Sequence, residues 1–199
     1  MENLKKKIRS ERSRRIGLLG LAANPPHNGH LQVAKLILRK KLVDAVWLVP
    51  CYSHPFNKPL APFKHRYAMA LLMGNKEIQA TNVEFRLKGR SYTIETVKAL
   101  QKEYPCCDFF WIVGSDIVKS GSYKKWKEWG EISSLVDFLA VNRPGFKIKK
   151  IPSGFIAVKG KMSNISSTEI RERIRQGLPI DGLVPLKIKE YIEKHNLYK

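Results

Sequence analysis

Two histidines three residues apart, His27 and His30, are the first side chains in this sequence whose type and spacing suggest chemistry. They follow an apolar run at 16–21 and precede residues with helical spacing, so we expect both at a helix N-terminus, pointing the same way. Free N–H groups at such an end bind phosphate, imidazoles add donors, and Gly29 lets the backbone approach a ligand. Taken alone, residues 27–30 favour ordinary solvent-facing histidines, and no third ligand at a usual spacing supports a metal site.

A second candidate phosphate site lies near the other end of the chain, at 165–171. Ser166 and Glu169 have the spacing of a capping box, which predicts a helix start. The hydroxyls that follow and the fork-shaped guanidinium of Arg171 are suited to phosphate oxygens. Because any capped amphipathic helix can show this pattern, it is weak evidence alone. The two sites together predict more, since a parallel sheet can bring both helix starts to one edge, where they would grip a triphosphate from two sides.

Strands and helices that alternate along the chain must position these residues. Apolar runs predict strands at 16–21, 45–49, 108–113, 135–141 and 155–158, and an extended segment at 82–87. Helical spacing predicts helices from Leu31 onward and at 63–73, 92–104, 126–132, 168–176 and 186–195. This alternation predicts an α/β fold of the Rossmann-like, doubly wound type, with a mostly parallel sheet and helices on both faces.

Ligands of such sheets bind beyond the carboxyl ends of the strands. We therefore expect the loops after Leu21, Pro50, Gly114 and Val141 to converge on the site.

Composition limits the class of protein more than its function. The 199 residues, 43% of them hydrophobic, predict one globular domain at 16–199 after a basic N-terminal tail at 1–15. The net charge of +20 favours anionic partners: nucleotides, nucleic acid or a membrane surface. Three cysteines make no disulfide framework, no apolar run is long enough to cross a bilayer, and no secretory signal is evident, so we expect a cytoplasmic protein.

Several short motifs together resemble a known family. Residues 27–30 and 165–171 resemble the two signature motifs of the nucleotidyltransferase superfamily, in the same order. The segments at 91–96, 114–116, 141–145 and 183–192 resemble those of bacterial nicotinate-nucleotide adenylyltransferases. The resemblance covers the chain from about Ile16 onward.

The resemblance implies adenylyl transfer from ATP to nicotinate mononucleotide, which gives deamido-NAD and pyrophosphate in NAD biosynthesis. The acceptor phosphate would attack the α-phosphate of ATP in line, with no covalent enzyme intermediate. Catalysis would then consist mainly of positioning and stabilisation of spreading negative charge. The resemblance also implies Mg²⁺ bound with ATP, held mainly by phosphate and water and not by a metal site of the protein.

The resemblance further assigns roles to individual residues. The implied catalytic residues are His27, His30 and Arg171, with His30 at the α-phosphoryl group. The implied ATP-binding residues are Gly20, Ala22, Gly29, Gly114, Asp116, Ile165, Ser166, Ser167 and Thr168, with Asp116 accepting from a ribose hydroxyl. The implied acceptor-binding residues are Asn24, Lys64, Arg66, Tyr92, Thr93, Tyr123, Trp126 and Arg143. For Lys64, Arg66 and Arg143, a surface ion pair is an equal alternative.

The sequence also departs from the family pattern. Leu21 replaces a glycine of the first motif, and Asn24 replaces its aspartate. Tyr123 stands where the family places a tryptophan that stacks on the pyridine ring, while we expect Trp126 mainly to pack in the core.

These departures leave alternative acceptors open: nicotinamide mononucleotide or, less favoured, phosphopantetheine. A second class of function, a basic RNA-binding relative with weak or no transferase activity, also stays open because of the charge.

Overall fold

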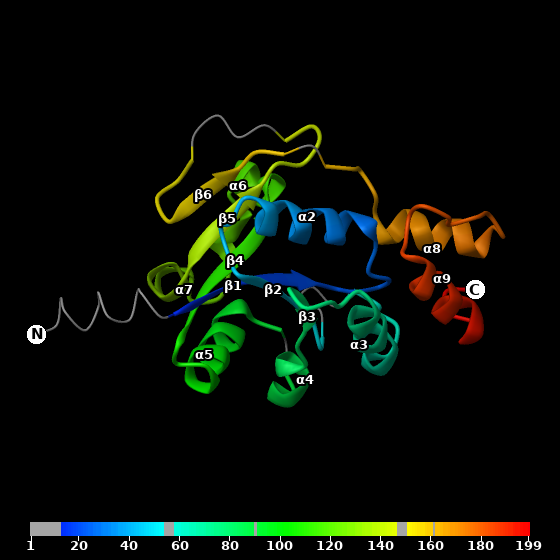
Figure 1. Ribbon diagram of the computed structural model, residues 1–199, viewed down its shortest axis with the longest axis horizontal. Helices are drawn as coiled ribbons and strands as arrows, with labels where there is room; N and C mark the ends of the chain where they lie inside the picture. Colours follow the sequence, from blue (N-terminus) through cyan, green and yellow to red (C-terminus); the bar gives the residue numbers. More distant parts are fainter. Residues whose placement is uncertain (1–12, 54–57, 90, 147–150, 161) are drawn as a thin grey trace, which may run out of the picture.

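Six parallel strands form one sheet within residues 13–53, 58–89, 91–146, 151–160 and 162–199, the parts of the chain that the computed structural model describes. The strands are β1 (Arg14–Leu21), β2 (Ala45–Pro50), β3 (Ile78–Ala80), β4 (Cys107–Gly114), β5 (Asp137–Val141) and β6 (Phe155–Val158). Their order in the sheet is β3-β2-β1-β4-β5-β6 (Figure 1), so the direction of winding reverses between β1 and β4. Ligand sites in doubly wound folds lie at this switch point.

Both faces of the sheet are buried, and side chains alternate between two hydrophobic clusters. Along β1, Ile16 and Leu18 belong to one cluster, whereas Leu19 and Leu21 belong to the other. The same alternation runs through β2, β4 and β5, as expected when successive side chains point to opposite faces. The predicted α/β fold with a parallel sheet is therefore confirmed.

Helices cover both faces (Figure 1). The helix α2 (Asn28–Arg39) packs in the first cluster with residues of α3 (Phe63–Leu72), α8 (Ser167–Arg175) and α9 (Leu186–Lys194). The opposite cluster includes residues of α4 (Val83–Leu87), α5 (Thr93–Glu103), α6 (Ser115–Ser120), the 3-10 helix η1 (Ser122–Lys125) and α7 (Trp129–Leu135). No described helix has the length and hydropathy needed to cross a bilayer.

The segment at 82–87 differs from its predicted extended form, because it is the short helix α4. Apolar residues at 83, 85 and 87 have the spacing of a strand, but Phe85 and Leu87 are exposed and have no sheet to cover. The Thr81 hydroxyl accepts the Val83 N–H, and Asn82 accepts the Arg86 N–H, so the chain turns into a helix. The edge strand β3, which the apolar pattern did not predict, precedes this turn.

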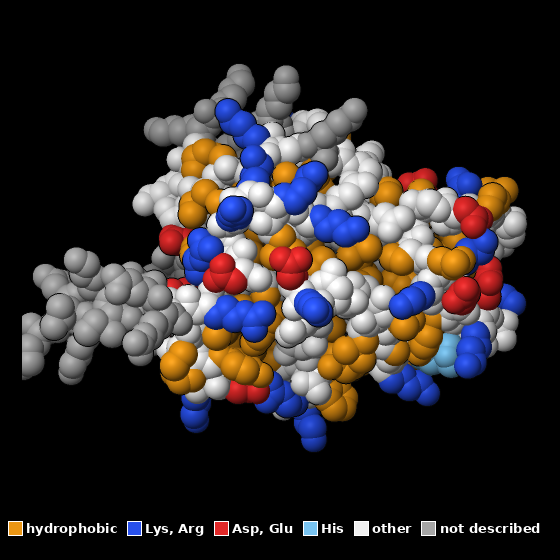
Figure 2. Space-filling view, in the orientation of Figure 1, with side chains coloured by type: hydrophobic (Ala, Val, Ile, Leu, Met, Phe, Trp, Pro, Cys, Tyr) orange, Lys and Arg blue, Asp and Glu red, His pale blue; other side chains and the backbone are white. Residues whose placement is uncertain are grey.

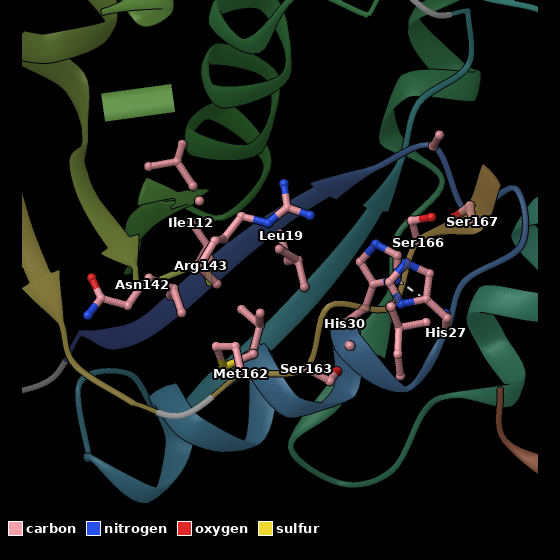
Figure 3. A pocket seen from close by; sticks show the side chains of 17 residues that line it. Leu19, His27, His30, Ile112, Asn142, Arg143, Met162, Ser163, Ser166 and Ser167 are labelled. Carbon is pink, nitrogen blue, oxygen red and sulfur yellow. Dashed lines mark hydrogen bonds between the residues drawn. The ribbon is translucent and has the colours of Figure 1, made fainter. Parts of the chain in front are cut away.

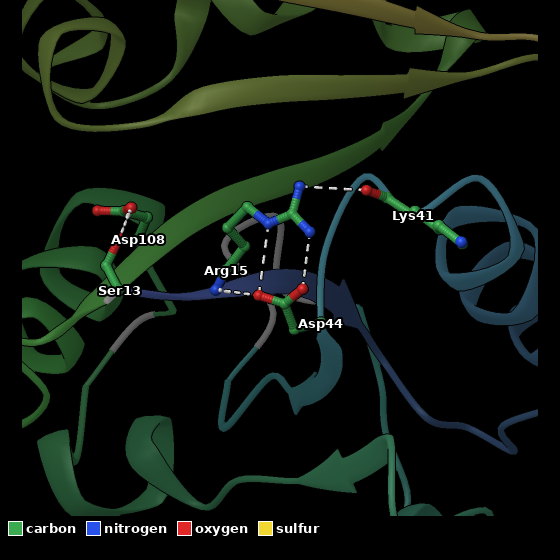
Figure 4. Close-up of polar contacts among 5 residues, drawn as sticks. All are labelled: Ser13, Arg15, Lys41, Asp44 and Asp108. Carbon is green, nitrogen blue, oxygen red and sulfur yellow. Dashed lines mark hydrogen bonds and ion pairs between the residues drawn. The ribbon is translucent and has the colours of Figure 1, made fainter. Parts of the chain in front are cut away.

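The first strand begins earlier than predicted and takes in the end of the expected tail. Arg15 lies in β1, and its guanidinium forms an ion pair of 2.7 Å with Asp44 (Figure 4). The Ser13 hydroxyl donates to the Asp108 carboxylate at the start of β4. The boundary at residue 15 was therefore placed too late, and residues 1–12 of the predicted tail lie outside the described residues.

Candidate active site

Two adjoining cavities open at the carboxyl ends of β1 and β4, where the sheet changes its direction of winding. The first cavity has a volume of about 320 Å³ and the second of about 570 Å³. They share five lining residues: Leu19, Ala22, Ile112, Val113 and Gly114. Two ligands, one in each cavity, would therefore meet across this common wall.

The two histidines of the first motif line the first cavity, as the sequence predicted. His27 is the N-cap of α2, and the centroids of its ring and the His30 ring are 3.8 Å apart (Figure 3). The backbone N–H of His27 donates to Nδ1 of His30 at 3.1 Å. Because Nδ1 accepts this bond, a neutral His30 carries its proton on Nε2, which is then a hydrogen-bond donor.

Both imidazoles are held in the neutral form. Burial, with a smaller contribution from Arg143, lowers the pKa of His27 to about 4. Burial also lowers the pKa of His30 well below its ordinary value, with the nearby His27 and Arg143 adding to the effect. At neutral pH the pair can donate hydrogen bonds to phosphate without carrying a formal charge.

The second motif reaches the same cavity from the far end of the chain. Ser166 caps α8 by accepting the Glu169 N–H at 3.1 Å, which confirms the predicted helix start. Ile165, Ser166 and Ser167 line the first cavity, and the two serines lie near the histidine rings (Figure 3). Two helix N-termini far apart in the sequence, capped by His27 and Ser166, thus converge on one cavity, as predicted.

Direct hydrogen bonds join the second motif to the loop that leads to His27. The Ser167 hydroxyl donates to the Pro25 carbonyl at 2.8 Å, and Nη1 of Arg171 donates to the Asn24 carbonyl at 2.8 Å. Arg171 also contacts the Thr168 hydroxyl at 3.4 Å, and neither of these two side chains lines the first cavity. Their predicted phosphate contacts remain a prediction.

Two glycines of the site have no room for a side chain. A Cβ on Gly29 would lie 2.9 Å from Nδ1 of His27, so the absence of a side chain there lets the ring pack over the helix start. A Cβ on Gly114 would lie 2.2 Å from Oδ1 of Asp116 and 2.8 Å from Cδ of Arg143. Gly114 therefore allows the Arg143–Asp116 ion pair, of 3.0 Å, to cross the end of β4.

Some predicted nucleotide contacts lie elsewhere in the structure. Arg143, expected at the acceptor, lines the first cavity. Gly20, expected at ATP, lines the second, where a Cβ on it would lie 2.9 Å from the Trp111 ring. Asp116 lines neither cavity, although its Oδ1 is buried and has no hydrogen-bond partner among the described residues. Ala22 lines both cavities.

The second cavity contains the SYT segment that the sequence assigned to the acceptor. Tyr92 and Thr93 line it at the start of α5, together with Trp126, and their contact with an acceptor stays a prediction. Lys125 and Lys127 flank this tryptophan in the lining. Aromatic and cationic groups therefore face one another in a cavity of a size suited to a mononucleotide.

Tyr123 does not occupy the stacking position that the sequence assigned to it. It is 7% exposed, lies outside both cavity linings, and packs in the core against Trp129 and Phe155, with ring centroids 4.7 and 4.9 Å away. Trp126 packs against the core rings of Trp129 and Phe138, as expected, and it also lines the second cavity. Trp126 has extended backbone dihedrals at the end of η1, so the chain leaves the helix there and the indole turns to the cavity.

Three other predicted acceptor contacts also lie outside both cavities. The Asn24 side chain is buried and accepts the Ala61 N–H at 3.1 Å, so it shapes the loop before His27. Lys64 is exposed on α3. Arg66 is 1% exposed and its guanidinium binds backbone carbonyls, so the surface ion pair predicted as the alternative is wrong.

Sequence patterns missed several residues of the second cavity. Glu84 was overlooked because its segment was predicted as extended, although a carboxylate between Val83 and Phe85 was a usable signal. Cys51 follows β2, where a converging loop was predicted, and Lys125 and Lys127 belong to a basic run around Trp126. Figure 2 shows many Lys and Arg side chains on one face of the molecule, and this positive charge favours anionic ligands in general.

Comparison with known proteins gives consistent findings. Residues 22–173 match the family model described as cytidylyltransferase-like. Over 193 residues the chain is 38% identical to the probable nicotinate-nucleotide adenylyltransferase of Shouchella clausii, covering 93% of this chain and 97% of that one. It is 34% identical to the nicotinate-nucleotide adenylyltransferase of Bacillus subtilis, covering 94% and 99% of the two chains.

A solved structure shares the fold. Plasmodium falciparum nicotinic acid mononucleotide adenylyltransferase, complexed with NaAD, superposes with a TM-score of 0.79 over 93% of this chain and 97% of that one. The sequence identity is 24%, so this likeness bears on the fold.

Proposed function

Because this chain belongs to the cytidylyltransferase-like family, and within it to the nicotinate-nucleotide adenylyltransferases, we propose that it transfers the adenylyl group of ATP to nicotinate mononucleotide. The products are deamido-NAD and pyrophosphate, and the reaction belongs to NAD biosynthesis. The observation that carries this function is the meeting of two helix N-termini, at His27 and Ser166, in a cavity that shares a wall with a second one.

The first cavity is assigned to the phosphates of ATP. Gly29 and His30 at the start of α2 and Ser166 and Ser167 at the start of α8 line it, and helix N-termini favour anions. Nε2–H of His30 supplies a neutral donor for the charge that develops on the α-phosphoryl group. Arg171 and Thr168, next to the cavity, are assigned to the β- and γ-phosphates, and the buried Oδ1 of Asp116 to a ribose hydroxyl.

The second cavity is assigned to the acceptor mononucleotide. The ring of the acceptor stacks on Trp126, and the phosphate of the acceptor points over the shared wall, at Ala22 and Gly114, toward the first cavity. Lys125 lines this cavity and forms no ion pair with a described residue. An unpaired ammonium beside the ring favours nicotinate, which carries a carboxylate, over nicotinamide, which does not.

Magnesium belongs to this proposal as a companion of ATP. Within the described part of the chain, no three His, Cys, Asp or Glu side chains are grouped to hold a metal ion. The residues therefore suit a cation that is held by phosphate oxygens and water. Bound in that way, it would neutralise charge on the triphosphate. The three free cysteines support a place in the cytoplasm for the enzyme.

The test is pyrophosphate release from ATP with each candidate acceptor in turn. We expect nicotinate mononucleotide to give the highest kcat/KM, ahead of nicotinamide mononucleotide and phosphopantetheine. Faster turnover with either of the other acceptors would reject the assignment of the acceptor and keep the reaction class.

The charge of +20 keeps RNA binding as a second candidate function. Such binding should weaken steeply with salt, because it depends on displaced counterions. RNA binding that persists at high salt, together with no pyrophosphate release, would favour this candidate over adenylyl transfer.

A further inference from the structure

A buried arginine ties together two loops near the two cavities. Arg66, 1% exposed on α3, donates through Nε to the Ala61 carbonyl at 2.7 Å. Its Nη1 donates to the carbonyls of Ala22 at 2.9 Å and Cys51 at 2.5 Å, and its Nη2 to the Tyr52 carbonyl at 3.0 Å. These carbonyls come from the loop after β1 and from the start and the end of the connection between β2 and α3. The planar fork of a guanidinium spreads its donors over three nitrogens and can so reach four carbonyls, whereas a lysine has three donors on a single nitrogen.

The Tyr52 peptide lies between Arg66 and the carboxylate of Glu84, which compensates its charge. Arg66 forms no ion pair with any carboxylate among the described residues, and a buried charge without compensation is costly. The Tyr52 peptide, whose carbonyl binds Arg66, donates its N–H to Oε2 of Glu84 at 3.2 Å. Glu84 is 6% exposed, and its Oε1 accepts the Thr96 hydroxyl at 3.0 Å. Burial raises the pKa of Glu84, an effect that its hydrogen bonds and the nearby Arg66 oppose.

The same peptide also holds the segment assigned to the acceptor. Its N–H contacts the Ser91 hydroxyl at 2.8 Å, and the Ser91 N–H donates to the Ser53 carbonyl at 3.1 Å. Tyr92 and Thr93, which follow at once, line the second cavity. On the other side of Arg66, Ala22 lines both cavities and leads to His27. One chain of hydrogen bonds therefore runs from the loop assigned to the phosphates to the segment assigned to the acceptor.

We propose that Arg66 and Glu84 are positioning residues that act through the Tyr52 peptide as one clamp and fix the acceptor segment relative to the phosphate-binding loop. The inference rests on the proposed function, since it assigns the clamp to alignment of the acceptor phosphate with ATP. In-line transfer depends on such alignment, and a displacement of about 1 Å can cost about 10²-fold in rate. Neither residue touches the reacting atoms, so each acts through the loops that it holds.

Glu84→Gln tests the clamp with little change of shape, because it removes the charge and one acceptor. We expect kcat to fall about tenfold and the KM for the acceptor to rise about tenfold, with the KM for ATP changed less than twofold. Glu103→Gln is the matched control. Glu103 pairs with Arg86 at 2.6 Å and so also joins α5 to α4, but it lies outside both cavities. Equal kinetic effects of the two variants, or an equal rise of both KM values in Glu84→Gln, would overturn the proposal.

Thermal unfolding tests the charge coupling independently of activity. In an Arg66→Lys background, which keeps the charge, we expect Glu84→Gln to lower Tm as it does in the wild type. In an Arg66→Met background we expect Glu84→Gln to lower Tm less than in the wild type, or to raise it. Without the arginine, the buried carboxylate of Glu84 has no compensating charge, so its removal costs less. The same loss in all three backgrounds would overturn the clamp. If the Met variant does not fold, the kinetic comparison with Glu103→Gln decides.

A wild type that is inactive with nicotinate mononucleotide would reject the proposed function, while the unfolding data would still decide on the clamp.

Discussion

The two cavities share a wall but are built in different ways. The first is formed by two helix starts, a pair of neutral histidines and short hydroxyl side chains. The second is formed by single residues from many segments: the ends of β1, β2 and β4, a carboxylate of α4, the start of α5 and the residues around Trp126. Two contiguous motifs therefore supply much of the site assigned to ATP, together with the ends of β1, β4 and β5, whereas the site assigned to the acceptor is assembled from single residues of many segments.

This difference separates chemistry from selectivity. Binding of a triphosphate needs N–H groups and donors at fixed helix ends, which a short motif can encode completely. Selection of one acceptor among similar nucleotides needs ring faces and charges at chosen places. Variants of the first cavity should therefore alter turnover, and variants of the second should alter the KM and choice of acceptor.

The largest effect is expected for His30→Ala in the first cavity. Loss of a donor to the developing charge should lower kcat by about 10²–10³-fold, with the folded structure kept by circular dichroism. His65→Ala is the matched control, because His65 binds Tyr191 away from both cavities. Near-normal turnover of His30→Ala would remove the main chemical distinction between the cavities.

The neutral state of His27 predicts an acid-sensitive stability. The pKa of His27 is about 4 in the folded chain, against 6.5 for the ordinary group, so the unfolded chain binds more protons between these values. Stability should therefore be lost as the pH falls from 6.5 to 4, and this one group contributes up to about 3 kcal/mol. Urea unfolding at pH 7 and pH 4 should show a smaller loss for His27→Gln than for the wild type. Equal losses would contradict the buried, neutral histidine.

In the second cavity, exchange of aromatic residues separates Trp126 from Tyr123. Trp126→Ala should raise the acceptor KM about tenfold through lost stacking, while the KM for ATP changes little. Tyr123→Phe keeps the ring that packs in the core and should leave both KM values unchanged. A large acceptor effect of Tyr123→Phe with none for Trp126→Ala would restore the role predicted from the sequence.

The smallest effect concerns the charge beside the ring. Lys125→Gln should raise the KM for nicotinate mononucleotide roughly 2–5-fold, the size expected for an exposed ion pair, and leave that for nicotinamide mononucleotide unchanged. Lys124→Gln is the neighbouring control, since Lys124 is exposed and outside the cavity lining. Parallel changes with both acceptors would show that Lys125 does not distinguish the ring substituent.

Local patterns were enough to predict the parts of the fold with a clear period. The apolar strands at 45–49 and 108–113, the helix at 92–104 and the capped helix after Ser166 all occur close to their predicted bounds. The prediction of an extended segment at 82–87 was wrong, because apolar residues alternate along the sequence in the same way whether or not they pack on a sheet. The position predicted for Tyr123 was wrong because its ring is buried against Trp129 and Phe155, contacts that spacing along the chain does not reveal.

The sequence by itself determined the parallel α/β fold, the family and the two motifs assigned to phosphate, because hydrophobic period and short motifs are local properties of a chain. Only the tertiary structure decided that Arg66 is a buried tie between loops, that Glu84 and Lys125 belong to a cavity, and that Trp126 faces it. These roles depend on which carbonyls and rings meet across distant loops. That depends on how the elements pack, which no spacing along the chain records.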